Sequence, residues 1–580
     1  MGAIFGFSGA PDENIRKRMA GVLSHRGNFP PLYSETKEGT LGYIPHLEEN
    51  KRKTLGAGLY VENCSAIVMA GQIRYPALAT ELLPHILKKF QEEGPGFVAR
   101  LRGSFVMAIR IKNALHLVRD GAGVRTVYFG SHKNRFLFAV EPKGILAFPG
   151  FPKNLRPGAV AQYLTFSFIP GYQTMLEDLF ELPAGHIVTW NGGGKPEINR
   201  YFLFEKEEKE ERPEEFWIDS FRNILQESVQ EQLPDNEAVG LFLSGGIDSS
   251  VVAVEAAAQS TNALKTFAIH FGKNYPNELE YAAQVASRLK TEHEEVEITP
   301  EDFLPRLRKM IWHLDEPIGD PITMPNFELS ARVSSEIRWV FNGEGGDPLF
   351  GGPKNLTMLM HHWYGGVERD QFFRERMYLT SYQRCYEELP RLLTENWQKR
   401  YSSQNELEGI LQPYFNCSRP EALLDKLMAI NLRLKGAHLI LPKVERMTGA
   451  WGLVSLSPLF DERLIRLSFQ MPPTLKLARG IEKVVMKKAY QNLLPASVIN
   501  RPKSGMRVPV HFWFQGEMQS YAKKILAPKS LSEAGIFNPD RVQQLLEYNT
   551  EEGPGRYGLR LWMLLTFEIW RRIVIEGEAI

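Results

Sequence analysis

The chain has 580 residues, of which 43% are hydrophobic and 24% charged, so it is a globular protein too long for a single core. Its 69 basic and 68 acidic residues leave a net charge of +1, which gives no support to binding of nucleic acid or of an anionic membrane. Three scattered cysteines, Cys64, Cys385 and Cys417, are too few for a disulfide framework and favour a reducing, cytoplasmic setting. The sequence shows neither a signal peptide nor an apolar run long enough to span a membrane.

Residues 1–204 are predicted to be rich in β-strands. Short β-type runs are separated by Gly, Asn and Pro, and they cover residues 65–71, 103–111, 114–120, 126–131, 135–140 and 186–190. Residues 205–215 follow, and all of them except Pro213 are charged. A run of mixed charge is usually a solvated linker or helix face, so we predict a domain boundary here.

Residues 216–580 form the second predicted domain. Apolar runs at 238–243, 264–271 and 292–298 alternate with helical patterns at 248–259, 278–289 and 300–314. This alternation predicts a parallel sheet covered by helices. After Gly352 we expect no further strands, only helices.

The strongest local signal is Leu241–Ser250, LFLSGGIDSS, a buried strand that runs into a glycine turn and then a helix. Gly245 and Gly246 let backbone N–H groups approach an anion closely, and the helix start adds unpaired donors. The hydroxyls of Ser244 and Ser249 can donate to phosphate oxygens, and Asp248 can hold a divalent metal. Gly-Gly after a strand is also an ordinary tight turn. No Gly-Lys-Ser/Thr follows, which disfavours a Walker A site, whereas SGGxDS resembles the loop of ATP pyrophosphatases.

A second glycine-rich cluster, FNGEGGDPLFGG, spans Phe341–Gly352. It follows an apolar run and should lie at the carboxyl end of a strand, where open parallel sheets bind ligands. Glu344 and Asp347 then face the same crevice as Asp248, and Asp347 becomes a second magnesium ligand, although both acids could simply form a turn. Upstream, LDEPIGDPITMP contributes three further acids that we expect at the same mouth: Asp315, Glu316 and Asp320.

Two lysines complete the candidate site. A reaction that builds negative charge on a carbonyl and expels pyrophosphate needs fixed cations aimed at both groups. Lys503, in an Arg-Pro-Lys-Ser-Gly turn, is our candidate for the oxyanion, and Lys483 is our candidate for the phosphates, both near helix ends or loops. An isolated lysine is most often a surface residue.

Taken together, SGGIDSS, DEPIGDP, NGEGGDPLFGG, SPLFDERLIRLSF, EKVVMKKAY and RPKSGMRVP resemble, in this order, the synthetase domain of the asparagine synthetase family. SHRGN, LRGSFVMAI, LVRDGAGVRTVYFG and LPAGHIVTW resemble its N-terminal nucleophile glutaminase domain, which implies an αββα fold. The resemblance implies that a carboxylate attacks the α-phosphorus of MgATP, and that an amine then displaces AMP. It assigns pyrophosphate binding to Ser244, Gly245, Gly246, Asp248 and Ser249, Mg²⁺ to Asp248 and Asp347, catalysis to Lys503 and phosphate binding to Lys483. Glu344 keeps the family residue and can act as a base.

The departures from the family pattern bear on glutamine use and on the acceptor. Glutamine-hydrolysing members begin Met-Cys-Gly-Ile, whereas this chain begins Met-Gly-Ala-Ile, so Gly2 offers no thiolate. Ala70-Gly71-Gln72 replaces the family's Asn-Gly-Glu, although Arg26 remains. Val454 and Leu456 replace a Glu and Arg pair, which counts against aspartate as the acceptor and suggests an apolar acceptor pocket.

Three functions remain open at this stage. The first is an amide-forming ligase that needs no glutamine and takes an amine already on a small-molecule or peptide substrate, as β-lactam synthetases and lasso-peptide cyclases do. The second is an asparagine synthetase fed by ammonia or by a partner glutaminase, and the third is a scaffold without catalysis. A homodimer or a biosynthetic partner protein fits any of them. The N-terminal domain is expected to pack against the synthetase half and wall its active site.

Overall fold

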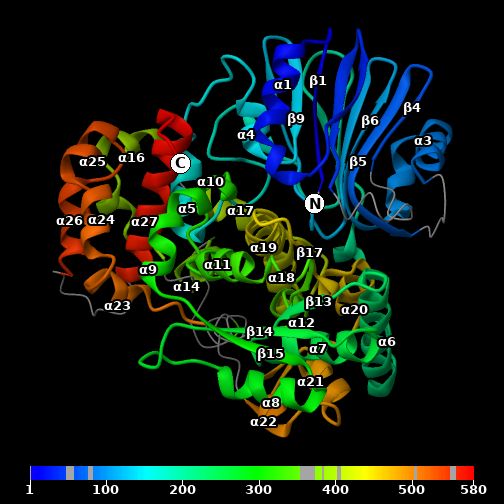
Figure 1. Ribbon diagram of the computed structural model, residues 1–580, viewed down its shortest axis with the longest axis vertical. Helices are drawn as coiled ribbons and strands as arrows, with labels where there is room; N and C mark the ends of the chain where they lie inside the picture. The colour runs from blue at the N-terminus through cyan, green and yellow to red at the C-terminus, as the bar shows by residue number, and fades with distance from the viewer. Residues whose placement is uncertain are drawn as a thin grey trace.

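The computed structural model describes residues 2–46, 58–75, 82–352, 359, 372–381, 384–401, 406–501, 506–548 and 557–580. Figure 1 shows two stacked N-terminal sheets above a third sheet, with the C-terminal helices beside them. None of the helices described is both long enough and apolar enough to cross a membrane.

The N-terminal sheets are antiparallel, and each contains six strands. The first has the order β10-β8-β9-β1-β3-β2, and its strands are β1 Ala3–Ser8, β2 Leu32–Thr36, β3 Gly39–Ile44, β8 Tyr128–His132, β9 Arg135–Ala139 and β10 Leu179–Glu181. The second has the order β12-β11-β7-β6-β5-β4, and its strands are β4 Gly58–Glu62, β5 Ser65–Tyr75, β6 Arg102–Ile111, β7 Ala114–Arg119, β11 His186–Trp190 and β12 Glu197–Arg200. All six strands predicted from the sequence in this part are present.

The alternating side chains of β5 explain why these sheets stack. Ala66 and Val68 point into the core between the two sheets, whereas Ile67 and Met69 point outward beneath a helix. Within the described residues, four helices accompany the sheets: α1 Glu13–Val22, α3 Leu82–Glu93, α4 Pro142–Leu146 and α5 Pro157–Phe166. Because α1 and α4 cover the first sheet and α3 covers the second, the layers have the expected αββα order.

The third sheet is parallel, with the order β15-β14-β13-β16-β17, as the alternating pattern predicted. Its strands are β13 Val239–Phe242, β14 Lys265–His270, β15 Glu292–Glu297, β16 Trp339–Phe341 and β17 Val454–Leu456. Helices cover both faces, so Val340 packs under α11 while Phe341 packs on the opposite side with Val251 of α7. The helices of this part are α6 Glu214–Gln232, α7 Ile247–Gln259, α8 Leu279–Leu289, α9 Pro300–Phe303, α10 Leu307–Leu314 and α11 Thr323–Val333.

The expectation that strands end at Gly352 is wrong. β17 adds a fifth strand beside β16, and a small antiparallel pair follows, β18 Leu477–Ala478 with β19 Ile481–Glu482. These strands have only two or three residues and owe their form to hydrogen bonds with a neighbouring strand, so no local period reveals them.

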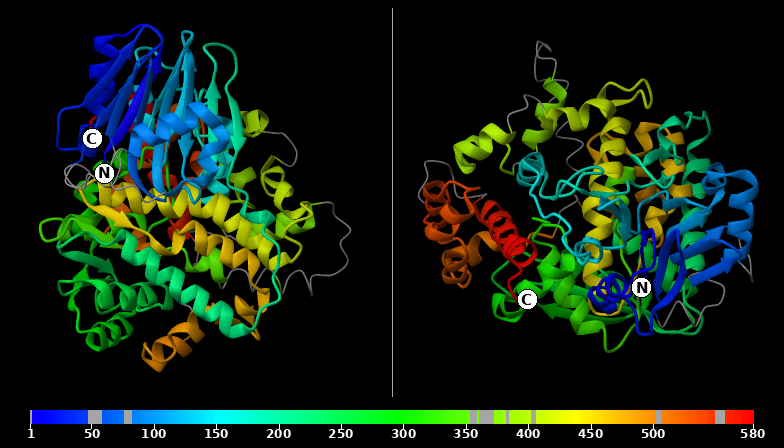
Figure 2. Two further views of the ribbon diagram at one scale, coloured as in Figure 1. Left: turned by 90° about the vertical axis from the view of Figure 1, so that its right-hand side faces the viewer. Right: turned by 90° about the horizontal axis from the view of Figure 1, so that it is seen from above.

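The rest of the chain is helical. One continuous helix, residues 423–449, consists of α18 Leu423–Ile430, a π-helical segment Asn431–Ile440 and α19 Leu441–Gly449. We call it the interdomain helix, because it runs beneath the N-terminal sheets (Figure 2). The other helices are α12 Gly346–Phe350, α14 Phe373–Ser381, α15 Leu389–Leu392, α16 Glu395–Tyr401, α17 Glu406–Phe415, α20 Glu462–Gln470, α21 Val484–Tyr490, α22 Ala496–Asn500, α23 Val510–Gln515, α24 Gln519–Ile525, α25 Pro528–Ala534, α26 Pro539–Leu546 and α27 Tyr557–Arg571.

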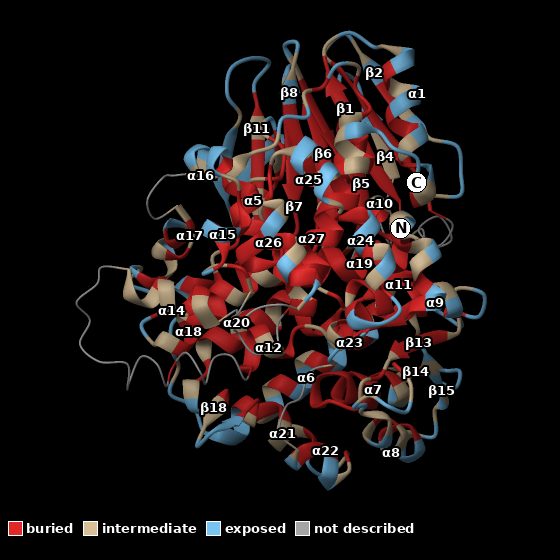
Figure 3. Ribbon diagram, turned by 90° about the vertical axis from the view of Figure 1, so that its left-hand side faces the viewer, coloured by how far each residue is buried: buried red, intermediate tan, exposed pale blue. Residues whose placement is uncertain are grey.

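Helix α27 holds the C-terminal helices together. It is apolar nearly all round, and every residue from Gly558 to Arg571 except Leu559 has little solvent exposure. Figure 3 shows it buried among α10, α24 and α26.

The charged run 205–215 is only partly a solvated linker. Glu205 is buried and its carboxylate accepts a 2.8 Å hydrogen bond from Arg433 of the interdomain helix. Lys209 lies 2.7 Å from the carboxylate of Asp425 on the same helix. Only residues 211–215 are uniformly exposed, so the first half of the run is docked by its charges rather than free. The sequence did not reveal this, because both partners lie more than 200 residues away.

Candidate active site

The first loop of the site connects β13 to α7. Gly245 has a φ of +69°, and a Cβ there would lie 2.5 Å from the backbone nitrogen of Ala282, so only glycine fits this turn. The hydroxyls of Ser244 and Ser249 lie 3.1 Å apart, and that of Ser249 also accepts from the backbone N–H of Ser244. Gly246 caps the helix, as the strand-turn-helix reading predicted.

The second loop connects β16 to α12 and lies directly against the first. A Cβ on Gly343 would be 2.4 Å from the backbone nitrogen of Ser249, and one on Gly346 would be 2.1 Å from Oδ1 of Asp248. The two glycines therefore permit a contact between loops that any larger residue would prevent. Asp347, the residue after Gly346, is thereby placed beside Asp248.

Lys483 joins the two carboxylates. Its Nζ lies 2.5 Å from Oδ2 of Asp248 and 2.5 Å from Oδ1 of Asp347. The lysine is fully buried and occupies the N-cap of α21, with a left-handed backbone conformation at φ +57°. Three residues singled out from three separate motifs thus meet at one point.

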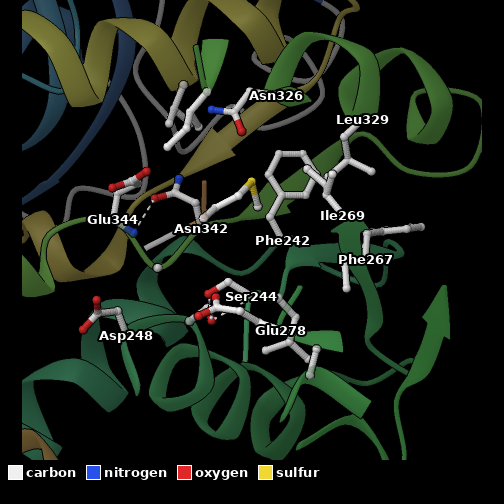
Figure 4. Close-up of a pocket in the computed structure, with 18 of the residues that line it drawn as sticks. Phe242, Ser244, Asp248, Phe267, Ile269, Glu278, Asn326, Leu329, Asn342 and Glu344 are labelled. Atoms are coloured by element: carbon white, nitrogen blue, oxygen red, sulfur yellow. Dashed lines mark hydrogen bonds between the residues drawn. The ribbon is translucent and has the colours of Figure 1, made fainter. Parts of the chain in front are cut away.

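Ser244, Asp248, Ser249 and Asp347 line a cavity of about 460 Å³ at the carboxyl ends of the parallel strands, whereas the buried Lys483 contacts the two carboxylates without lining it. Figure 4 shows Ser244, Asp248 and Glu278 on one side, with Glu344 and Asn342 across from them. Its other end is apolar and is formed by Phe242, Phe267, Ile269 and Leu329. A polar end with carboxylates and serines and an apolar end beside it suit a ligand with a phosphate tail and a flat, weakly polar ring.

Two lysines of the cavity were missed by the sequence analysis. Lys435 and Lys443 reach it from the interdomain helix, on the side opposite the first loop. The ammonium of Lys443 donates a 3.1 Å hydrogen bond to Asp320. Burial alone would raise the pKa of Asp320, but Lys443 outweighs it and lowers that pKa to about 2. Neither lysine belongs to a recognisable motif, so only the fold brings them here.

Other predicted residues lie elsewhere. Lys503 falls within residues 502–505, outside the described residues, although its neighbours Met506 and Arg507 line the cavity. Of the three acids expected at the mouth, only Asp320 lines the cavity. Asp315 pairs instead with Lys143 at 2.7 Å, and Glu316 accepts from a backbone N–H of the N-terminal part, because the chain passes under the sandwich here.

The two residues that replace the Glu and Arg pair lie outside the cavity wall. Val454 and Leu456 are both buried, and they pack in the core shared by β13, β16 and α7. Neither side chain contributes to the cavity wall. The expectation that losing the charged pair disfavours an aspartate acceptor stays a prediction.

The N-terminal residues expected to handle glutamine are engaged in packing. Gly2 is buried directly before β1, and Ala70 is buried on β5 between the sheets. The Arg26 guanidinium contacts the carboxylate of Glu445 on the interdomain helix and lies 3.3 Å from that of Glu141. This arginine therefore joins the sandwich to the helix that carries Lys435 and Lys443.

Fold and site together define an ATP-dependent ligase with an amidotransferase-like N-terminal part. The family model for asparagine synthase matches residues 220–572, and that for the glutamine amidotransferase domain matches residues 80–202. Since the first match covers more than half of the chain, the protein belongs to the asparagine synthase family.

Relatives agree with this assignment. Asparagine synthetase [glutamine-hydrolyzing] 1 of Bacillus subtilis is 27% identical over 86% of this chain and 81% of its own. A putative asparagine synthetase of Mycobacterium bovis is 25% identical over 85% and 80%, and amidase chry2 of Gibberella zeae is 22% identical over 81% and 79%. Among solved structures, an NH3-dependent NAD synthetase of Campylobacter jejuni matches 38% of this chain and 92% of its own, at 18% identity. Its TM-score of 0.19 is too low to support any statement about this chain.

Proposed function

We propose that this protein activates a substrate carboxylate with ATP and joins it to an amine. In the first step a carboxylate oxygen bonds to the α-phosphorus, and the bond from that phosphorus to the oxygen bridging the β-phosphate breaks, which releases pyrophosphate. In the second step the amine nitrogen bonds to the acyl carbon, AMP leaves, and the nitrogen loses a proton. The convergence of Asp248, Asp347 and Lys483 beside a glycine turn supports this proposal most strongly.

The residues present fit a magnesium ion. Asp248 and Asp347 converge closely enough that one ammonium contacts both, and carboxylate oxygens are the ligands that Mg²⁺ prefers. In the described part of the chain no third acid, histidine or cysteine joins them in a cluster, which suits an ion that takes its other ligands from phosphates and water. Bound Mg²⁺ would neutralise charge on the departing pyrophosphate. Ser244, Ser249 and the N-terminus of α7 would hold the phosphates in place.

Glu344 and Lys503 take the remaining roles in this proposal. Glu344 lines the cavity across from the first loop and is the carboxylate placed to accept the amine proton. Lys503 would stabilise the oxyanion, as the family resemblance implies.

We further propose that the protein does not hydrolyse glutamine. Gly2 lacks a side chain where the family pattern has its nucleophile, and Arg26 is committed to Glu445 and Glu141. The nitrogen then comes from an amine of the substrate itself, as in cyclases, or from ammonia or a partner glutaminase. Three free cysteines in the described residues suit the reducing cytoplasm.

The experiment is a pyrophosphate-release assay with candidate carboxylates and peptides, combined with chromatography of the nucleotide product. Release of pyrophosphate together with AMP supports the proposal, whereas ADP and phosphate as products contradict it. Conversion of aspartate to asparagine that requires ammonium would select the parent reaction. Calorimetry with MgATP separates an inactive scaffold from a ligase whose substrate is missing, because a scaffold need not bind the nucleotide.

A further inference from the structure

The interdomain helix serves both halves of the molecule. On one side its residues bond to the N-terminal sheets: His438 lies 2.9 Å from Glu181, and the backbone oxygen of Ala437 accepts a 2.8 Å bond from Arg119. On the other side Lys435 and Lys443 line the cavity. We call the interdomain helix the roof of the cavity and the first loop its floor.

The π-helical segment determines which residues the roof presents. Lys435 and Lys443 are eight residues apart. In a regular α-helix each residue turns about 100°, so two residues at this spacing would point in directions about 80° apart around the helix axis. In a π-helix, with hydrogen bonds from i to i+5, each residue turns only about 80°. From Lys435 to Ile440 the helix is π-helical and from there to Lys443 it is α-helical, so the two lysines are separated by about two full turns and lie within about 20° of one face. The wider turn therefore aligns two cations over one cavity.

The two cations differ in their bonding. Lys443 is held by Asp320, whereas Lys435 makes no hydrogen bond or ion pair with any residue in the described ranges. Burial lowers the pKa of Lys435, and the carboxylates of Asp347, Asp320 and Glu344 act against that change. Lys435 is therefore a cavity-lining cation whose donors remain available.

A carboxylate that enters this cavity meets strong repulsion. Asp320, Glu344 and Asp347 already line the wall, and the phosphates of a bound nucleotide would add further negative charge on the floor. Lys483, which does not line the cavity, is committed to Asp248 and Asp347. An anionic acceptor thus needs a cation in the cavity wall. Arg507 lines the cavity as well, and Lys435 is the cation that the roof offers with unused donors.

We propose that the ammonium of Lys435 binds the acceptor's carboxylate and holds it under the roof, facing the nucleotide. This assignment rests on the proposed ligase function, and it deepens that function by naming a residue that selects an anionic acceptor. Lys435 is a binding residue for the acceptor and not for ATP. The π-helical segment is the structural device that positions it.

The test uses the full-length protein with α,β-methylene-ATP and Mg²⁺, which allow binding without turnover. Succinate, L-aspartate and acetate are titrated separately into this complex by calorimetry, for wild type, Lys435→Met and Lys435→Arg. Lys524→Met, on the exposed face of α24, is the matched control. We expect Lys435→Met to weaken binding of the carboxylate at least tenfold, Lys435→Arg to keep most of it, and nucleotide affinity to stay within about twofold in all variants.

Three results would overturn the assignment. Loss of nucleotide affinity in Lys435→Met would place the lysine at the phosphates, and unchanged carboxylate affinity would remove it from the acceptor site. Binding of none of the three carboxylates to the wild-type nucleotide complex would also refute it, while leaving the ligase proposal intact. If wild type fails to bind the nucleotide at all, the proposed function itself is wrong. Equal unfolding midpoints for wild type and Lys435→Met confirm that any loss is local.

Discussion

Replacing Lys483 by methionine tests the electrostatic centre of the site. The substitution keeps the length of the side chain but removes the charge that lies 2.5 Å from both Asp248 and Asp347. Breaking a buried ion pair typically costs about 3–5 kcal/mol, because the remaining charge stays desolvated. The Asp347 side chain is 37% exposed and water compensates part of its charge, so we expect the lower end, about 3 kcal/mol. That corresponds to roughly a hundredfold change in the unfolding equilibrium.

The assay is urea unfolding followed by tryptophan fluorescence, with and without MgCl2. Because Mg²⁺ can replace the missing cation between the carboxylates, it should stabilise Lys483→Met more than wild type. Adding Asp347→Asn to Lys483→Met should recover part of the lost stability, since one of the two facing charges is then gone. The reasoning is refuted if Lys483→Met unfolds like wild type, or if MgCl2 stabilises both proteins equally.

Three further substitutions test the turn, the N-terminal site and the junction. Gly245→Ala should abolish MgATP binding in calorimetry, since its Cβ would overlap the backbone of Ala282 and φ is +69°; normal affinity would contradict a close-fitting turn. Gly2→Cys alone should release no glutamate from glutamine in a coupled assay, because Ala70 provides no amide donor; measurable release would show that the site survives. Arg26→Met removes one cation from the buried carboxylates of Glu445 and Glu141, which keep Arg125 and Lys143, and should lower the free energy of unfolding by about 3 kcal/mol, the low end for a broken buried ion pair. Urea unfolding measures this change, and a loss under about 1 kcal/mol would argue against the ion pairs.

Features with local causes could be predicted from the sequence. The turn at Gly245 and the loop before Asp347 follow from glycine chemistry next to an apolar run, and the alternating pattern gave the order of strands and helices around them. The convergence of both loops followed because the carboxyl ends of parallel strands share one edge. Lys483 was found because EKVVMKKAY is a recognisable string.

Features with distant causes could not be predicted. β17 forms because it hydrogen-bonds to β16, which lies more than 100 residues earlier in the chain. Glu205 is buried because its carboxylate accepts a hydrogen bond from Arg433 of the interdomain helix. Lys435 and Lys443 were missed because neither belongs to a recognisable motif, and only the fold brings them to the cavity. The role of Arg26 in joining the two parts of the chain depends on its contact with Glu445, which lies more than 400 residues away in the sequence.

Because the two stacked N-terminal sheets are bonded to the interdomain helix, removing the N-terminal part would destabilise the rest of the protein. Truncation there would leave Glu445 and His438 without the groups that compensate them, on the same helix that carries Lys435. An amidotransferase-like part with Gly2 in place of a cysteine can thus be retained because it supports the interdomain helix. Its retention requires no chemistry of its own, because the position of the interdomain helix depends on the N-terminal sheets that contact it.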